Sequence, residues 1–272
     1  MPLDRMTRYP LESVAPLLQR AAKELVLPRW RQLKAGDAQQ KSPGEWVTVV
    51  DQEVEAQLSA GLQALLPDST VVGEEQCALT PQLLERIDEG RVWLIDPIDG
   101  TGNFIAGCGP VSVMVALLEH GETLASWMLD PLTGVMHQAI KGGGAWRDGQ
   151  RLVALPSAAP AGQGIVKTRF LPEDIKHHLA QSAAGVAFQS GSNCAGDDYP
   201  RVMLADSEFA LYWRVLPWDH APGALFASEA GGVVARLDGS AYRPGEQQPG
   251  LLVARNQAAW DRARAYFPAT AV

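Results

Sequence analysis

Apolar residues recur at helical spacing in two stretches near the start of the chain. In residues 11–33 they lie on one helical face, with lysine and arginine on the opposite face, which predicts an amphipathic helix. A second stretch, residues 52–66, ends at Pro67-Asp68, which stop a helix. Residues 46–50 have the pattern of an extended segment. The chain is therefore predicted to begin with two helices joined by extended backbone.

Short apolar runs after the second helix predict strands. Residues 92–95 form such a run and end at Asp96-Pro97, which is typical of a buried strand whose C-terminal end turns sharply. Four further segments are separated or followed by turn residues and predict an antiparallel meander: residues 111–118, 124–129, 135–140 and 145–146.

In the second half of the chain, strands and helices are predicted to alternate. Five segments have strand character: residues 165–167, 186–188, 209–213, 233–237 and 251–254. Helical stretches between them favour an α/β arrangement on a mixed sheet. Residues 155–162, rich in alanine and proline, are predicted to be a seam. This seam would divide an N-terminal α+β half, residues 1–155, from a C-terminal α/β half, residues 156–272.

Composition and charge narrow the class of protein. With 272 residues, 46% of them hydrophobic, the chain can bury a large core, and its formal net charge of −8 argues against a nucleic-acid polymer or an anionic membrane as partner. Its three cysteines lack CxxC spacing, which argues against a disulfide framework and a thiolate zinc site. Residues 1–10 have no apolar run typical of a secretory signal. These features predict a protein of the reducing cytoplasm.

The most informative polar residues follow the first predicted strand. Residues 96–101 read Asp-Pro-Ile-Asp-Gly-Thr, and the proline forces the chain off the strand path, so that Asp96 and Asp99 can converge on one point. Mg²⁺ prefers oxygen ligands, and two such ions can share one bridging carboxylate. Gly100 would let backbone approach an anion closely, and the Thr101 hydroxyl can orient a nucleophilic water. An ordinary surface turn is the alternative.

Two further acidic positions stand at predicted element ends. Glu74 and Glu75 follow the apolar strand of residues 70–72, where a glutamate can close a metal shell that two aspartates leave open. A solvated loop is the alternative for this pair. Asp219 precedes a helical pattern that ends at Gly231-Gly232. It can be a helix N-cap, a metal ligand or both, because a carboxylate has two oxygens.

Taken in order, these three motifs resemble those of the inositol monophosphatase family. The resemblance covers most of the chain and implies a layered αβαβα sandwich of the α/β (α+β) class, usually a homodimer, that uses Mg²⁺ and is commonly inhibited by Li⁺. Carried over residue by residue, it implies the ligands of two or three Mg²⁺ ions: Glu74, Asp96, the Ile98 carbonyl, Asp99 and Asp219. Asp96 would bridge two ions.

The resemblance also implies roles at the reaction centre. Thr101 and Glu74 would act on the attacking water. Glu45 would partner Thr101, because Glu45-Trp46-Val47-Thr48 stands where the family often has Asp-Leu-Val-Thr. Four residues would contribute to substrate binding: Gly100, Thr101, Asp99 and Asp219. The amides near Gly100 and Thr101 would hold the phosphate. Arg214 is predicted either to meet a second anionic group of the substrate or to face outward. It lies in a run that departs from inositol-specific members, which tend to place a sugar-binding glutamate near it.

The predicted activity is Mg²⁺-dependent hydrolysis of a small phosphate monoester by metal-activated water, with an inositol-1-phosphate-like substrate favoured. Histidinol phosphate, another sugar phosphate and a 3′-phosphonucleotide remain open. A haloacid-dehalogenase-type phosphatase is a second enzyme hypothesis, since residues 96–101 are similar to its Asp-x-Asp-x-Thr signature, although the spacing differs by one residue. A noncatalytic sugar-phosphate-binding regulator is the hypothesis from another class.

Overall fold

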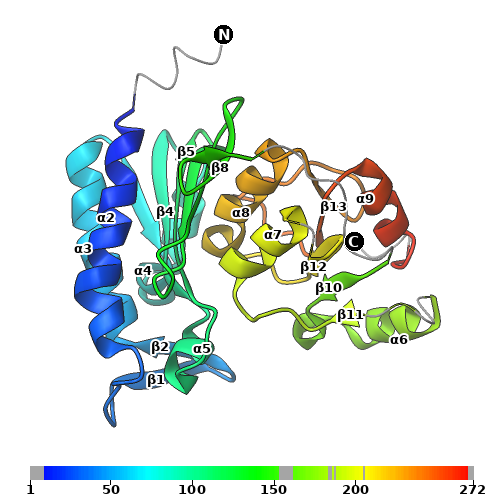
Figure 1. The fold of residues 1–272 in the computed structure, drawn as a ribbon, viewed down its shortest axis with the longest axis horizontal. Coiled ribbons are helices and arrows are strands. Elements are labelled where there is room, and N and C mark those ends of the chain that lie inside the picture. The colour runs from blue at the N-terminus through cyan, green and yellow to red at the C-terminus, as the bar shows by residue number, and fades with distance from the viewer. Residues whose placement is uncertain (1–8, 153–161, 183–185, 187, 205, 269–272) are drawn as a thin grey trace.

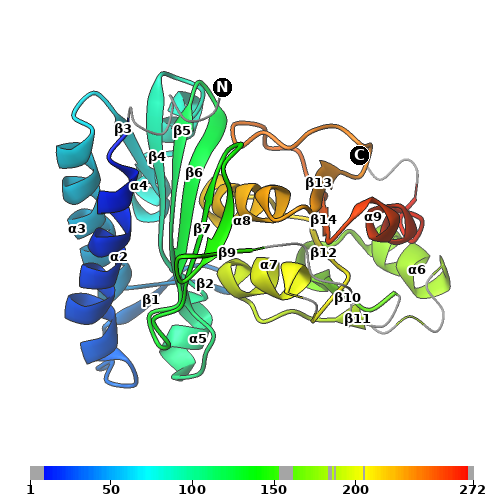
Figure 2. The same cartoon turned by 45° about the horizontal axis from the view of Figure 1, so that its top comes forward.

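The computed structural model describes residues 9–152, 162–182, 186, 188–204 and 206–268. Helices and sheets alternate in five layers across the molecule (Figures 1 and 2). An outer pair of helices covers a seven-stranded sheet, a second pair lies between this sheet and a five-stranded sheet, and a third pair covers the far face. The layered αβαβα sandwich predicted from the family resemblance is thus confirmed.

The layers are built from helices with these bounds: α2 (Val14–Ala21), α3 (Val49–Leu65), α4 (Glu74–Leu79), α5 (Thr101–Ala106), α6 (Glu173–Ser182), α7 (Ala195–Met203), α8 (Pro217–Glu229) and α9 (Gln257–Arg264). Apolar faces of α2 and α3 pack on the large sheet, α7 and α8 fill the space between the sheets, and α6 and α9 close the opposite side. None of the helices in the described residues combines the length and the apolar character needed to span a bilayer.

The large sheet has the strand order β3-β4-β5-β6-β7-β8-β9. Its members are β3 (Thr70–Gly73), β4 (Arg91–Asp99), β5 (Ser112–Glu119), β6 (Glu122–Leu129), β7 (Met136–Ile140), β8 (Gly144–Arg147) and β9 (Gln150–Arg151). Strands β3 and β4 are parallel, and every later neighbour is antiparallel. The predicted meander is therefore confirmed.

The smaller sheet is mixed, with the order β11-β10-β12-β14-β13. Its members are β10 (Gly164–Val166), β11 (Phe188–Gln189), β12 (Phe209–Tyr212), β13 (Val233–Arg236) and β14 (Leu251–Ala254). β10 is parallel to both of its neighbours, whereas β12, β14 and β13 are antiparallel in turn. A separate hairpin, β1 (Ala38–Ser42) and β2 (Glu45–Thr48), lies below the large sheet in Figure 1.

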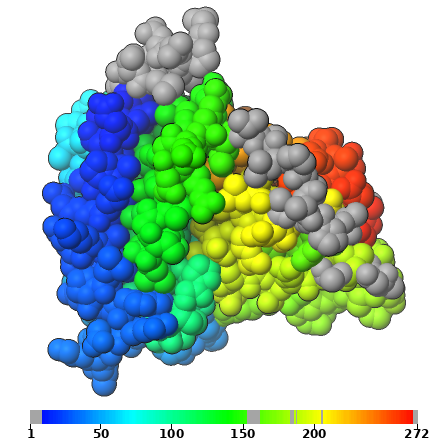
Figure 3. Space-filling model, in the orientation of Figure 1, coloured from blue at the N-terminus to red at the C-terminus, as the bar shows by residue number. Residues whose placement is uncertain are grey.

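The helices α7 and α8 join the two sheets into one core. Met114 and Met128 of the large sheet share a buried cluster with Phe226 of α8 and Val253 of the small sheet. In the space-filling view, the yellow surface of α7 meets the green surface of the large sheet directly (Figure 3). The predicted boundary between residues 155 and 156 lies outside the described residues, as does residue 187 within the predicted strand 186–188. The division into halves stays a prediction.

The first predicted helix is shorter and more irregular than its apolar pattern indicates. Regular helix covers only Val14–Ala21, followed by a π-helical turn, Ala22–Val26, and a 3₁₀ turn, Leu27–Arg29. Pro28 has no N–H to donate to a preceding carbonyl, so the regular pattern cannot continue through it. The prediction of one helix over residues 11–33 is therefore wrong at its C-terminal end.

The second helix begins earlier than predicted, at Val49. Thr48 forms a capping box: its Oγ1 accepts hydrogen bonds from Val50 N and Asp51 N, while Asp51 Oδ2 accepts one from Thr48 N at 2.8 Å. This cap ends the extended segment at Thr48. It also places the buried Asp51 in the first turn of α3, with its second carboxylate oxygen free to act elsewhere.

Strand β4 continues past Pro97 to Asp99, whereas the sequence predicts a sharp turn after Asp96. The pairing is irregular here, because Asp96 lies opposite Met114 and Asp99 opposite Ser112, which leaves one extra residue on β4. Such a bulge tolerates the missing N–H of Pro97 and turns the following side chains. Asp96 and Asp99 thus sit on the bulged end of a central strand.

Candidate active site

Adjacent chain ends bring the predicted metal ligands together. Glu74 is the first residue of α4, directly after β3, and Gly73 is paired with Ile95 on the parallel strand β4. Glu74 and Asp96 therefore leave neighbouring strands at the same level. Asp219 lies in the first turn of α8, a helix that packs against β4. It is not the N-cap considered from the sequence, because Leu216 holds that position.

Asp96 lies at the electrostatic centre of this group. Its side chain is 2% exposed, and Oδ1 has no hydrogen-bond partner among the described residues. Burial raises the pKa of Asp96 well above its ordinary value, and nearby carboxylates raise it further: Glu74, Asp99, Asp219 and Asp51. Several neighbouring acids therefore oppose the ionisation of one buried carboxylate. A divalent cation bound among them would offset this repulsion.

The other two aspartates share this field. Burial raises the pKa of Asp99 to about 6, although the Lys167 charge and the Gly196 N–H, 2.7 Å from Oδ2, oppose the rise. Burial raises the pKa of Asp219 to about 8, with the charges of Asp99 and Glu74 adding to the effect. Both groups are costly to ionise unless a cation joins them.

The donor chemistry fits Mg²⁺, but the side chains are not gathered into a closed ligand shell. Lys41 Nζ donates to Glu74 Oε1 at 2.8 Å and to Glu75 Oε1 at 2.9 Å. Within the described residues, no group of three or more His, Cys, Asp or Glu side chains forms a metal-binding cluster. The candidate ligands are carboxylates and one backbone carbonyl, the oxygen donors that Mg²⁺ prefers.

The threonine of the central motif has a different partner from the one predicted. Thr101 Oγ1 lies 3.0 Å from the Ile98 carbonyl and 3.3 Å from Asp51 Oδ1. Glu45 instead forms an ion pair with Arg214 and accepts a hydrogen bond from Ser42 Oγ at 2.8 Å. The predicted pairing of Glu45 with Thr101 is therefore wrong, because Glu45 begins strand β2 and its carboxylate pairs with Arg214, which follows strand β12.

Asp51 is the site residue that the sequence reasoning missed. It is fully buried, and burial raises its pKa to about 7. Thr48 fixes one carboxylate oxygen through its N–H and through its hydroxyl, 2.5 Å away, which leaves the other oxygen to face Thr101. The sequence signal was the capping-box pattern Thr48-x-x-Asp51, read at the start of a buried helix.

Gly100 has the conformation and the space that only glycine tolerates well. Its φ is +87°, in the left-handed region, and it forms the N-cap of α5. A Cβ added there would lie 3.1 Å from the Pro110 carbonyl oxygen. The backbone can therefore turn tightly at Gly100 and present Thr101 at the start of α5, as the sequence predicts for a site that approaches an anion.

Arg214 lies at the edge of the acidic site, where it contacts residues far apart in the chain. Its guanidinium pairs with Glu45 and lies 4.3 Å from the centre of the Phe170 ring. His220 holds the backbone at this point, since its Nε2 is 3.2 Å from the Arg214 carbonyl and its Nδ1 is 3.1 Å from Tyr199 Oη. Burial lowers the pKa of His220 to about 3, so the ring is neutral and acts as a structural support.

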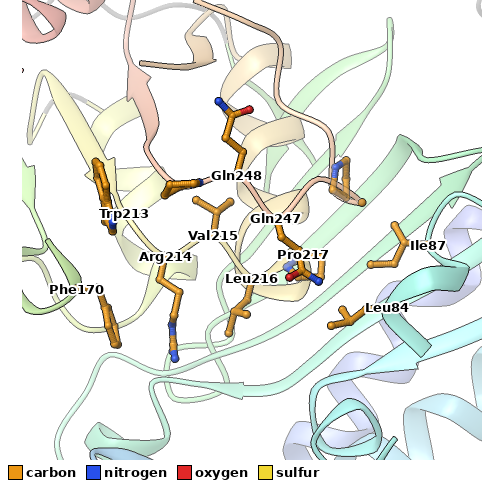
Figure 4. Close-up of a pocket in the computed structure, with 13 residues that line it drawn as sticks. Leu84, Ile87, Phe170, Trp213, Arg214, Val215, Leu216, Pro217, Gln247 and Gln248 are labelled. Atoms are coloured by element: carbon orange, nitrogen blue, oxygen red, sulfur yellow. The ribbon is translucent and has the colours of Figure 1, made fainter. Parts of the chain in front are cut away.

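A pocket of about 390 Å³ adjoins Arg214 (Figure 4). Its walls come from segments far apart in the chain: Leu84, Ile87, Phe170, Trp213, Arg214, Val215, Leu216, Pro217, Pro244, Gly245, Gln247, Gln248 and Pro249. Most of these side chains are apolar, and Arg214 is the charged one among them. The pocket is within the size range of small-molecule sites. Pro217 starts the helix that carries Asp219, so the first turn of α8 connects the pocket wall to this aspartate.

Burial of the acids predicts how the stability of the metal-free protein changes with pH. Burial raises the pKa of Asp51 and Glu55 to about 7 and that of Asp219 to about 8. In the unfolded protein these acids titrate near pH 4, so at about pH 6.5 the folded state holds protons that the unfolded state has already lost. As the pH rises to about 8, the folded state loses these protons too, at a cost in stability. The free energy of unfolding should fall by roughly 2–3 kcal/mol across this window. The buried neutral His137 and His220 act in the opposite sense, mainly below it.

Thermal melts in EDTA at the two ends of this window measure the effect. The melting temperature should be lower at the higher pH by roughly 5–10 °C. Saturating Mg²⁺ should remove most of the difference, because a bound cation favours the ionised carboxylates. Equal melting temperatures in EDTA at both pH values would contradict the raised pKa values.

The fold and the acidic site define a phosphatase, and comparison with known proteins identifies its family. The chain belongs to the inositol monophosphatase family, whose model matches residues 8–267. Family membership and the hydrolase class, both predicted from the motifs, are confirmed. Metal dependence is typical of the family.

Relatives cover nearly the whole chain. Nus factor SuhB of Escherichia coli K12 is 29% identical over 240 residues, which are 85% of this chain and 86% of SuhB. The 3′(2′),5′-bisphosphate nucleotidase CysQ of Shigella flexneri is 28% identical over 246 residues, which are 87% of this chain and 96% of CysQ. A solved IMPase/NADP phosphatase complexed with NADP and Ca²⁺ has a TM-score of 0.77 at 21% identity and 94% coverage of both chains. This last likeness concerns the fold.

Proposed function

We propose that this chain is a Mg²⁺-dependent phosphomonoesterase that hydrolyses a small phosphate ester by direct attack of water. The observation that carries the proposal is the buried Asp96, which has an unpartnered oxygen and lies in the field of other carboxylates. A divalent cation would satisfy that oxygen and offset the repulsion. The proposed ligands of two or three ions are Glu74, Asp96, the Ile98 carbonyl, Asp99 and Asp219.

Held by these residues, Mg²⁺ would supply positive charge that makes water more acidic and neutralises phosphate oxygens. Thr101 would orient the attacking water and pass its proton towards Asp51, whose Oδ1 lies 3.3 Å from the hydroxyl. A pKa of about 7, raised by burial, suits Asp51 as a proton acceptor near neutral pH. The backbone at Gly100 and Thr101, at the tight turn into α5, would face the phosphate.

Metal removal and restoration test this activity. Protein treated with EDTA should release no phosphate from the ester, and added Mg²⁺ should restore the rate, with Li⁺ inhibiting it. Trapping experiments should find no phosphorylated aspartate, because water is the nucleophile. A trapped phosphoryl group on Asp96 would support the haloacid-dehalogenase-type alternative instead. Metal-dependent ligand binding without phosphate release would support the noncatalytic regulator.

The pocket beside Arg214 bears on the substrate. An inositol-1-phosphate-like ester, favoured from the sequence, has a leaving group covered with hydroxyls, whereas the pocket walls are mostly apolar. An ester with an apolar ring and a second negative charge, such as a 3′-phosphonucleotide, matches these walls and Arg214 better. The bisphosphate nucleotidase name of the CysQ relative supports the same class. We therefore place this class ahead of inositol 1-phosphate, other sugar phosphates and histidinol phosphate.

Replacing Arg214 with alanine tests this substrate class. The KM for adenosine 3′,5′-bisphosphate should rise about 10- to 100-fold, because a charged hydrogen bond to the second phosphate is lost. The KM for adenosine 3′-monophosphate, the matched control substrate, should change little. Glu45 shares the guanidinium, so the second phosphate would compete with that carboxylate. Equal changes in KM for both substrates would show that Arg214 does not bind the second phosphate.

The predicted homodimer and the predicted cytoplasmic location also stay proposals. All three cysteines, Cys77, Cys108 and Cys194, are free thiols in the structure. Light scattering of the purified protein across a concentration series would measure the mass of the species in solution. A mass of one chain throughout would exclude a stable dimer.

A further inference from the structure

A buried glutamate on α3 caps the helix that carries a proposed metal ligand. Glu55 is 3% exposed and lies one helical turn after Asp51. Its Oε2 accepts the N–H of Glu75 at 2.7 Å, and its Oε1 accepts the N–H of Gln76 at 2.9 Å. These N–H groups belong to the first turn of α4 and have no partner within that helix. Glu55 therefore performs the capping that a side chain at the N-cap position normally provides.

The N-cap residue of α4 is a glycine, because a larger side chain would collide with the Glu55 carboxylate. Gly73 has no side chain to form a cap, and a Cβ built on it would lie 2.3 Å from Glu55 Cδ and 2.4 Å from Oε2. Its φ of −98° is open to any residue, so backbone conformation does not require glycine here. Gly73 and Glu55 are thus a matched pair, in which the missing side chain of one makes room for the carboxylate of the other.

This pair fixes the backbone next to Glu74. Glu74 is the first residue of α4, a helix of only six residues that has little stability of its own. An uncapped first turn would fray, and the Glu74 carboxylate would then sample positions away from Asp96. The same α3 helix also carries Asp51, which faces Thr101, so two buried acids on one helix hold two different parts of the site.

We propose that Glu55 is a positioning residue for Mg²⁺ binding, which acts by holding Glu74 at the metal site. The inference rests on the proposed function, because it takes Glu74 to be a metal ligand. Glu55 touches neither substrate nor the reacting water. Its removal should weaken Mg²⁺ binding more than it lowers the rate at saturating Mg²⁺.

The test compares Glu55→Ala, Glu55→Gln and Glu229→Ala with the unmodified protein. Glu229 is a matched control, because its carboxylate also accepts two backbone N–H groups, those of Gly142 and Gly144, at 2.7 and 2.9 Å. Glu55→Ala should raise the Mg²⁺ concentration for half-maximal activity about 10-fold or more. Calorimetric titration with Mg²⁺ alone, without substrate, should show the same loss of affinity. Glu55→Gln keeps an acceptor oxygen and should recover most of the affinity.

Each outcome separates positioning from general stability. Glu229→Ala should lower the melting temperature and leave Mg²⁺ affinity unchanged. If Glu55→Ala also lowers only the melting temperature, the positioning role is overturned while the proposed function stands. If Glu55→Ala does not fold, Gly73→Ala displaces the Glu55 carboxylate instead, and unchanged Mg²⁺ affinity in that variant would overturn the role. If the unmodified protein neither binds Mg²⁺ nor responds to it, the proposed function fails as well.

Discussion

Replacing Asp96 with asparagine is expected to lower kcat by about 10²- to 10⁴-fold and, in EDTA near pH 8, to raise the melting temperature. Asparagine keeps the shape of the side chain but has one neutral acceptor oxygen in place of a charged carboxylate, so it would hold a divalent cation less strongly. The same change removes a buried acid whose ionisation is opposed by burial and by the charges of Glu74, Asp99 and Asp219. Loss of rate and gain of stability should therefore occur together.

Two measurements test the expected rate and stability of Asp96→Asn. Phosphate release at saturating Mg²⁺ gives the rate, and thermal melts in EDTA give the stability. Asp130→Asn is a suitable control, because it makes the same chemical change at an aspartate that accepts backbone N–H bonds from Leu132 and Thr133 and lies outside the acidic cluster. Its rate should stay near that of the unmodified protein. A normal rate for Asp96→Asn would show that Asp96 is not a ligand of a catalytic metal ion.

Periodicity predicted most of the fold because its strands are half-buried or fully buried in a regular way. The meander from β5 to β8 and the strand β14 lie within a few residues of their predicted positions. The effect of a single proline on the backbone was harder to predict from the sequence. Pro28 interrupts the first helix as a proline should, whereas Pro97 does not end strand β4. A bulge accommodates Pro97, and only the pairing with β5 reveals that extra residue.

The site could be predicted as a set of acidic motifs, but their contacts could not. Motif order identified Asp96, Asp99 and Asp219, and the structure places their charges in one field. Contacts made by buried acids on α3 were missed, because Asp51 and Glu55 fall in a helix that looks amphipathic and ordinary in sequence. Their burial depends on how α3 packs beside α4 and α5, which is a tertiary property.

There is a physical reason why Asp51, and not the predicted Glu45, is the partner of Thr101. Glu45 lies three residues before the cap of α3, at the start of β2, and its carboxylate reaches Arg214 across the molecule. Asp51 lies three residues after Thr48, on the buried side of the first turn, with one oxygen fixed by the capping box. A fixed carboxylate can receive a proton from Thr101 in a defined direction, whereas an ion-paired surface carboxylate cannot.

This assignment gives the second large expected effect. Asp51→Asn should lower kcat by about 10²- to 10³-fold, because the variant loses the proton acceptor behind Thr101. Asparagine can still accept the Thr48 N–H and cap α3, so the helix should form normally. At saturating Mg²⁺, the KM for the ester should change less than kcat, since Asp51 is not a proposed metal ligand. Steady-state kinetics with one singly phosphorylated ester measure both values.

Glu45→Gln is the matched comparison, because it neutralises the acid that the sequence placed beside Thr101. Its kcat with the same ester should stay within about threefold of the unmodified protein, since a partly exposed ion pair contributes little. Thr101→Val should resemble Asp51→Asn, and the double variant should be no slower than either single variant, because both act on one proton path. A slow Glu45→Gln beside a normal Asp51→Asn would reverse the assignment and return Glu45 to the reaction centre.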